Sequence, residues 1–317
     1  MKVLLLGCNR LPTTYLDVGA HGLGRHVYDF IKELRSRQCD LTVMLHKNSK
    51  LEWDDVEFIP FCSENEAQCV KQVKSVYDAG FDLIFDNTHL KLFSSVFSDK
   101  SVPIINFMHD EECNFMPYNC IVVNEHQRIK YTDAKLYKTG INLDHFNVFE
   151  EKKDYLSYAG KIHPFKGYDI AAEIGKACNV EVVFAGPIYD ANAFNHIDKS
   201  NYLGEIKDHK LLCKHIGESF GILAPSRHDA GGIVIIEAAA MGTPCITLDT
   251  CGSQHNVKHG VTGYVVSSVL EAKSYIEKLK DLCPKTIRKF CEDNWNLSKN
   301  FDKIFNQCKR VVDGERW

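Results

Sequence analysis

The sequence contains no apolar run long enough to cross a membrane. Its opening stretch, MKVLLLGC, is interrupted by Asn9 and Arg10, whereas a spanning helix needs about 18 consecutive apolar residues. This stretch predicts a buried first strand rather than a secretory signal. Basic runs are missing too, and the net charge at pH 7 is −4. We therefore expect no nucleic-acid partner, no transmembrane segment and a cytoplasmic location.

Metal-binding spacings are also missing. The 13 cysteines form no C-x-x-C pair, and the 14 histidines form neither H-E-x-x-H nor H-x-H. These absences argue against a zinc site, and the scattered cysteines indicate free buried thiols in a reducing compartment. No Asp-x-Asp motif occurs either, so we expect neither a metal nor another cofactor.

What the sequence does contain is an alternation of short apolar runs and amphipathic segments. Runs rich in β-branched residues, without strict polar alternation, are typical of buried parallel strands. The first series is KVLLLG, LTVML, FDLIF, VPIINFM and CIVVN, with helices expected at 22–37 and 66–77. This order predicts an α/β fold with a doubly wound sheet.

The alternation then starts again. The second series of strands is YLSYAG, VEVVFAG, FGILAP and PCITL, with helices expected at 167–177, 207–217, 233–241 and 269–282 and two more within 284–312. The polar segment 144–154 between the two series predicts a linker. Because 317 residues are enough for two cores, we place domains at 1–148 and 149–295, followed by a C-terminal helix in 296–317.

One segment of the second domain combines an acidic residue with paired glycines. Asp229 precedes Gly231 and Gly232, which let the backbone approach a ligand closely. The next amides, those of Ile233 and Val234, are expected at a helix N-terminus, where phosphate is favoured. The segment therefore predicts a loop that enters a helix beside a bound phosphate.

A second acidic residue, Glu237, follows eight positions after Asp229 inside the apolar run GGIVIIEAAAMG. A carboxylate buried there needs a partner, and the vicinal hydroxyls of a ribose would supply one. Taken alone, Asp229 also fits a plain helix N-cap and Glu237 a surface position. Taken together, the two acidic residues predict a sugar-nucleotide site.

Four motifs in order then extend over most of the chain: HGLGRHVYDFIKEL, YKTGINLDHFNV, YAGKIHPFKGYDI, and the Asp229–Glu237 segment with its following A-x-A-x-G-T-P and G-x-T-G-Y-V-V. Together they resemble the retaining glycosyltransferases of family four (glycosyl transferases group 1). The resemblance implies the GT-B fold, in which two Rossmann-like domains face a cleft and the last helix crosses back to the first domain. It also implies metal-independent transfer with retention, from a nucleoside diphosphate sugar held mainly by the second domain. The acceptor, held by the first domain, would be a glycan, a lipid-linked sugar or a small molecule.

The resemblance also assigns roles to single residues. Lys161 and Lys166, in GKIHPFKG, would stabilise charge on the departing diphosphate. Glu237 would bind the ribose, and Asp229 would contact hydroxyls of the transferred sugar. His109 follows the strand VPIINFM, at the end of a parallel strand where ligands collect, and would lie beside the reacting sugar.

Two further donor contacts follow from the same resemblance. Ile206, in GEIKDHK, matches the position against which the base packs, and Gly22, in HGLGRHV, lies in the glycine loop that enters the first helix. A nicotinamide site is disfavoured at that loop, because G-x-G-x-x-G is absent and no acidic residue that could bind a ribose terminates the second strand, LTVMLHK.

The chain departs from the family pattern at four positions. Family members usually have arginine at Lys161, glutamate at Asp229, phenylalanine at Gly231, and a second glycine where His21 precedes Gly22. Two alternative functions stay open at this point: a GT-B nucleotide-sugar 2-epimerase and a non-catalytic sugar-nucleotide-binding protein. Simpler interpretations also exist for the cations and the histidine: two solvated lysines around a turn, and a hydrogen-bonded loop residue at His109.

Overall fold

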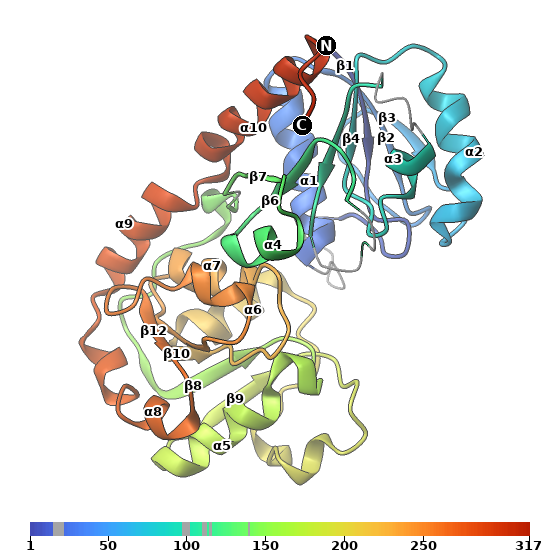
Figure 1. Ribbon diagram of the computed structural model, residues 1–317. Coiled ribbons are helices and arrows are strands. Elements are labelled where there is room, and N and C mark those ends of the chain that lie inside the picture. The colour runs from blue at the N-terminus through green and yellow to red at the C-terminus, as the bar shows by residue number, and fades with distance from the viewer. Residues whose placement is uncertain (15–21, 97–101, 110–112, 114–115, 139) are drawn as a thin grey trace. The chain divides into compact units, whose positions relative to one another are not determined.

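The computed structural model divides into two compact units, each built on one parallel sheet (Figure 1). It describes residues 1–14, 22–96, 102–109, 113, 116–138 and 140–317. The first unit comprises Met1–Thr139 and Leu297–Trp317, and the second comprises Gly140–Asn296. The segment 144–154, where the sequence suggests a linker, lies in the second unit. Leu143, directly before this segment, and Phe146, within it, are buried in that unit's core.

The described residues of the first unit form a seven-stranded parallel sheet in the order β3-β2-β1-β4-β5-β6-β7. The five apolar runs predicted as strands all lie in it. The edge strands β3 and β7 were missed, because β3 is short and largely exposed and β7 has only two residues. The strands are β1 (Lys2–Leu6), β2 (Asp40–Leu45), β3 (Glu57–Pro60), β4 (Leu83–Asp86), β5 (Ile104–Phe107), β6 (Cys120–Val122) and β7 (Lys135–Leu136).

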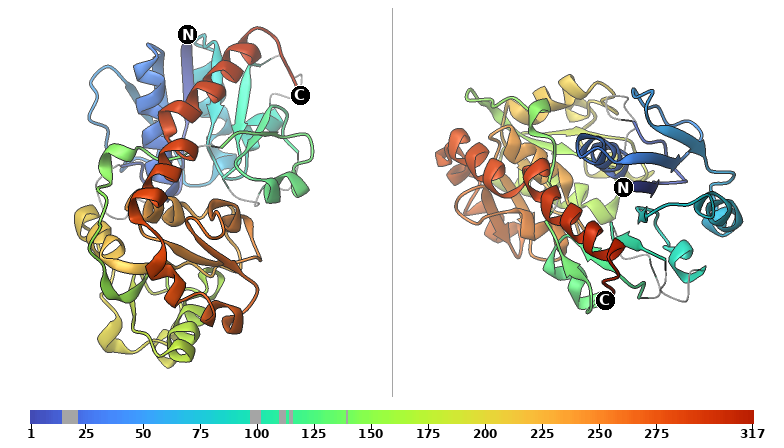
Figure 2. Two further views of the ribbon diagram at one scale, coloured as in Figure 1. Left: turned by 90° about the vertical axis from the view of Figure 1, so that its left-hand side faces the viewer. Right: turned by 90° about the horizontal axis from the view of Figure 1, so that it is seen from above.

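Helices cover both faces of this sheet because alternate strand residues point to opposite sides. Val3, Leu5 and Phe85 pack in the core with α1 (Gly22–Ser36) and α10 (Leu297–Val312), which run side by side in Figure 2. Leu4 and Leu6 pack on the other face with α2 (Glu66–Tyr77) and α3 (Leu92–Val96). The short α4 (Glu125–Lys130) lies beside β6.

The second unit has a five-stranded parallel sheet in the order β12-β11-β10-β8-β9. One face packs against α5 (Tyr168–Cys178) and α8 (Val269–Lys273), and the other against α7 (Ile233–Ala240) and α9 (Pro284–Asn294). The strands are β8 (Lys153–Ala159), β9 (Val182–Ala185), β10 (Ser219–Leu223), β11 (Cys245–Leu248) and β12 (Gly263–Val266), with α6 (His209–Gly217) leading into β10.

The helix predicted over 269–282 is wrong in its length. It ends at Lys273 and is followed by a separate 3-10 turn, Glu277–Asp281. The break places Tyr275 against Tyr264 of β12, with the two rings stacked at a centroid distance of 4.3 Å. This aromatic contact stabilises the path of the chain after Lys273.

Both sheets have a switch point, where successive connections leave in opposite directions. In the first sheet it lies between β1 and β4, and in the second between β8 and β10. The loops that follow such a strand pair diverge and leave room for a ligand at the carboxyl ends of the strands. The topology therefore predicts ligand sites at the loops after β1 and β4 and at those after β8 and β10.

The structure also shows the state of the cysteines and the hydropathy of the helices. All 13 cysteines are free thiols, and eight of them are buried. Within the described part of the chain, no helix is both long and apolar enough to span a bilayer.

Candidate functional site

The loop after β8 carries both lysines that the sequence selects. Tyr158, buried at the end of β8, donates its hydroxyl to the carbonyls of Lys161 (2.9 Å) and Lys166 (3.3 Å). Burial raises the pKa of Tyr158, so its hydroxyl stays protonated and keeps donating. The buried Tyr158 thus fixes the backbone of both lysines. The Lys161 side chain is exposed, with its ammonium 5.4 Å from the centre of the Tyr189 ring.

The loop after β10 brings Asp229 to this lysine loop. Lys166 Nζ lies 2.6 Å from Asp229 Oδ2. The other carboxylate oxygen, Oδ1, accepts hydrogen bonds from the amides of Gly231 (3.2 Å) and Gly232 (2.9 Å). The structure therefore joins these four predicted site residues in one polar cluster at the switch point of the second sheet.

A second ion pair, which the sequence did not suggest, ties the same two loops together. Arg227 donates to both carboxylate oxygens of Asp169, at 2.8 and 2.7 Å, and to the Pro164 carbonyl at 2.7 Å. Burial opposes ionisation of Asp169, but its bonds to Arg227 outweigh burial and lower its pKa. The amide of Arg227 also donates to the Phe165 carbonyl at 2.8 Å. Such a bidentate pair restricts geometry as well as adding energy, so Arg227 is a structural support of the site.

The glycine pair performs two different tasks. Gly232 adopts a left-handed conformation (φ 52°) as the residue before α7, and a Cβ there would lie 2.6 Å from the Ser253 Cβ. Gly231 has open space where a Cβ would be, and its carbonyl accepts from Asn256 Nδ2. Gly232 is therefore required by the fold, whereas the room beside Gly231 is compatible with a ligand.

The other residues that the sequence predicts to bind the donor lie on or near the same edge. Ile233 and Val234 form the first turn of α7 and are partly exposed, and amides in a first turn have no partner within their own helix. Glu237 lies one turn further on and is only 5% exposed. Ile206 is partly exposed between the 3-10 turn Lys199–Asn201 and α6.

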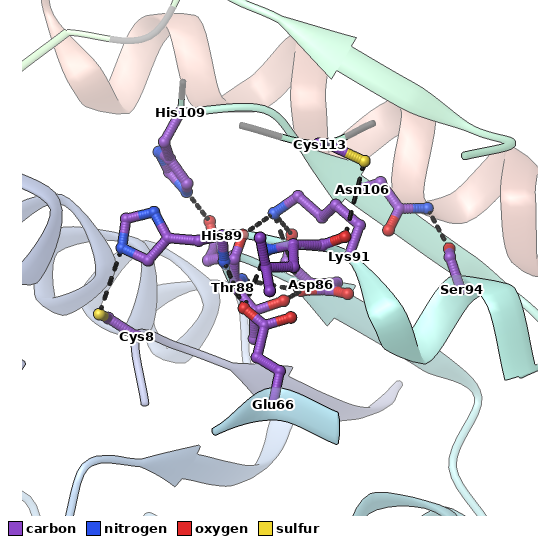
Figure 3. Close-up of polar contacts among 12 residues, drawn as sticks. Cys8, Glu66, Asp86, Thr88, His89, Lys91, Ser94, Asn106, His109 and Cys113 are labelled. Carbon is purple, nitrogen blue, oxygen red and sulfur yellow. Dashed lines mark hydrogen bonds and ion pairs between the residues drawn. The ribbon is translucent and has the colours of Figure 1, made fainter. Parts of the chain in front are cut away.

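His109 lies in the first unit, just beyond the carboxyl end of β5, and is partly exposed. Its Nε2 is 3.0 Å from Asn87 Oδ1, a contact drawn as the dashed line from the labelled His109 in Figure 3. The His109 ring packs against Phe107 and, edge to face, against His26, with centroid distances of 4.9 and 5.7 Å. Burial lowers the pKa of His26 to about 4, so this neighbour is uncharged near neutral pH.

Gly22 is the first residue of α1, whereas His21, one of the four departures from the family pattern, lies outside the described residues. The described residues contain no group of three or more histidine, cysteine or acidic side chains arranged to hold a metal ion.

Comparison with known proteins assigns the chain to a family. Residues 142–300 match the family model of glycosyl transferases group 1, which is half of the chain. The chain belongs to this family.

Two curated bacterial proteins match shorter stretches. An uncharacterised 41.2 kDa protein of the Klebsiella pneumoniae cps region is 29% identical over 125 residues, 38% of this chain and 35% of that protein. The capsular polysaccharide biosynthesis glycosyltransferase CapM of Staphylococcus aureus is 28% identical over 167 residues, 45% and 43% of the two chains. The match thus spans less than half of either relative.

Solved structures match over nearly the whole chain. AviGT4, a glycosyltransferase involved in avilamycin A biosynthesis, has a TM-score of 0.78 at 20% identity and covers 100% of this chain and 99% of its own. HepE of Anabaena, solved with UDP and glucose, has a TM-score of 0.73 at 14% identity and covers 98% and 100%. These likenesses concern the fold. They confirm the predicted α/β class with two Rossmann-like units of the GT-B type.

Proposed function

We propose that the chain is a retaining glycosyltransferase that moves a sugar from a nucleoside diphosphate sugar to an acceptor, without a metal ion. The observation that carries this proposal is the cluster in which Lys166 and the amides of Gly231 and Gly232 surround one carboxylate. An ammonium and two amides before a helix are also the donors that bind phosphate oxygens.

The proposed chemistry follows from where these donors lie. We expect a bound diphosphate to take over Lys166 and the amides of Gly231 and Gly232, which would release Asp229 to accept hydrogen bonds from sugar hydroxyls. Lys161, exposed on the same loop, adds a second cation. As the bond to the sugar breaks, charge develops on the departing phosphate, and donors that are already in place stabilise it without reorganisation. The rest of the rate enhancement is expected from holding the donor sugar and the acceptor in the correct relative geometry.

The relatives support the choice of donor class. The family model matches the unit that contains Lys166 and Asp229, and HepE has been solved with UDP-glucose. We extend this class of ligand to the present chain as part of the proposal. The acceptor is expected to bind to the first unit, where His109 lies beyond β5.

Donor binding without metal is the direct test. We expect a uridine, guanosine or thymidine diphosphate sugar to raise the melting temperature in EDTA, because ligand bound to the native state alone stabilises it. Product analysis by NMR should then show transfer or donor hydrolysis with the donor's anomeric configuration kept. An inverted product would exclude the retaining class, and a free epimerised nucleotide sugar would identify an epimerase. If none of these nucleotide sugars bound, the proposal would be wrong.

Replacing Glu237 tests the nucleotide end of the site. Glu237→Gln should weaken binding of the free nucleoside diphosphate by about 1.5–3 kcal/mol, the range for a hydrogen bond to a charged group. Glu173→Gln, at an exposed position of α5, is the matched control and should leave affinity unchanged. Calorimetric titration of both variants measures the difference. An unaltered dissociation constant in folded Glu237→Gln would exclude Glu237 from the site.

A further inference from the structure

A buried polar segment lies behind His109 in the first unit. Asp86 ends β4 and is followed by Asn87 and Thr88, and each of the three is at most 1% exposed. The Asn87 side chain places Oδ1 3.0 Å from His109 Nε2. Its backbone amide donates to the Leu6 carbonyl of β1 at 2.7 Å. The segment thus connects the switch-point strands to the histidine.

Lys91 fixes the backbone on both sides of Asn87. Its ammonium donates to the Asp86 carbonyl at 3.2 Å and to the Thr88 carbonyl, which come directly before and after Asn87. The same ammonium lies 3.8 Å from Asp86 Oδ1, and the whole lysine is buried. A buried cation is costly unless charge and hydrogen bonds compensate it. Lys91 therefore indicates a segment whose shape is tightly constrained.

Glu66 of α2 holds the next part of the segment. Its Oε1 accepts hydrogen bonds from the amides of His89 (2.8 Å) and Leu90 (2.9 Å). In Figure 3, Glu66 and His109 lie on opposite sides of the backbone that carries Asp86 and Thr88. The segment is thus held from β1, from α2 and by Lys91, which leaves Asn87 little freedom to move its amide.

Hydrogen-bond chemistry then determines the state of the histidine. An amide oxygen only accepts, so the facing Nε2 must carry a proton, and in the neutral ring the lone pair is then on Nδ1. Asn87 Nδ2 has no hydrogen-bond partner among the described residues. The hydrogen bond that the Asn87 side chain makes is therefore the one between its Oδ1 and His109 Nε2.

We propose that Asn87 is a positioning residue that holds the His109 ring in one orientation with its proton on Nε2. The consequence for catalysis rests on the proposed glycosyltransferase function. A ring held in place can interact with the transferred sugar as charge develops, without first having to reorient.

The first test is independent of activity. In protein labelled with ¹⁵N-histidine, the signals lost in His109→Ala identify the His109 ring. We expect wild-type protein to show a proton on Nε2 that exchanges slowly with water, and Asn87→Ala to lose this protection. A wild-type ring with its proton on Nδ1 and none on Nε2 would overturn the proposal, because Asn87 would then face it with the opposite end of its amide.

The second test is a double-mutant cycle on turnover. Asn87→Ala should lower kcat by roughly 3- to 10-fold, the effect of losing one neutral hydrogen bond, while nucleoside diphosphate affinity stays within about twofold. The double variant with His109→Ala should be no slower than His109→Ala alone, because coupled residues do not act additively. Additive losses would contradict a role of Asn87 through His109.

Asn106→Ala is the matched control. Asn106 is also a fully buried asparagine, on β5, but its Nδ2 donates to Ser94 Oγ and to the Tyr118 carbonyl. Its loss should lower the melting temperature without removing the protected His109 proton, and its effect on kcat should add to that of His109→Ala. If Asn106→Ala changed the His109 signal as Asn87→Ala does, general loosening of the core would replace positioning as the explanation.

The two proposals can fail separately. A wild-type protein that is inactive with every donor would count against the proposed function, and the NMR signal of the His109 ring proton would still decide the role of Asn87.

Discussion

Replacing Lys91 with methionine should lower the free energy of unfolding of the first unit by about 3–5 kcal/mol, the cost of removing one partner of a buried ion pair. Methionine fills a similar volume, so the loss is electrostatic. The Asp86 carboxylate, fully buried, would lose its nearby cation, and the carbonyls of Asp86 and Thr88 would lose a donor. Urea denaturation followed by circular dichroism measures the change.

The pH dependence of this loss separates charge from packing. Burial, and then the charge of Asp86, raise the pKa of Glu66. A carboxyl whose pKa is higher in the folded state binds more protons there than in the unfolded state, so its contribution to stability is lost as pH rises. Removing the Lys91 cation should raise this pKa further. The deficit of Lys91→Met should therefore be larger near pH 8 than near pH 5.

The exposed Lys74 of α2 provides the control. Lys74→Met should change stability by no more than about 0.5 kcal/mol at either pH, as is usual for surface positions. A deficit of Lys91→Met that is the same at both pH values would assign the effect to the lost carbonyl hydrogen bonds and packing rather than to the charge on Glu66. A deficit below about 1 kcal/mol would show that the Asp86–Lys91 pair is not a major support of the segment.

Periodicity and motif spacing predicted much of the fold, because the central strands are apolar throughout and need no distant information. The same applies to the loop into α7, since glycine permits the left-handed conformation that Gly232 adopts directly before the helix. Here the sequence also pointed to Asp229 and Lys166 as neighbours in function, and the structure places them in contact. The sheet order supplies the reason, because their loops follow adjacent strands.

Other supports of the site could not be predicted in this way. Arg227 and Asp169 are 58 positions apart, and each alone resembles an ordinary surface charge. Lys91 follows a histidine and a leucine in a polar stretch with no sign that its ammonium is buried. Asn87 has no motif of its own. In each case the decisive property is a contact that exists only once the sheet has assembled, so local patterns carry no signal for it.

Gly167→Ala should have the second of the two largest effects, because Gly167 lies where the two loops of the proposed donor site pack against each other. Gly167 directly follows Lys166 and has φ 73°; a Cβ there would lie 1.9 Å from the Pro225 carbonyl oxygen. The left-handed conformation costs alanine about 1–2 kcal/mol, and displacing a packed group costs about 1–3 kcal/mol more. We expect a total loss of about 2–5 kcal/mol in the stability of the second unit.

The same displacement should reach the polar cluster, because Pro225 leads into the loop that carries Asp229. As the loops separate, the 2.6 Å contact between Lys166 and Asp229 should lengthen, so donor affinity should fall along with stability. Gly260→Ala is the control for conformation alone, since Gly260 has a similar φ of 76° and a Cβ there would have nothing within 4 Å. It should cost only about 1–2 kcal/mol and leave nucleotide binding intact. Denaturation and calorimetric titration on both variants distinguish the two effects. Equal losses in the two variants would mean that the contact with Pro225 is relieved at little cost and does not set the distance between the loops.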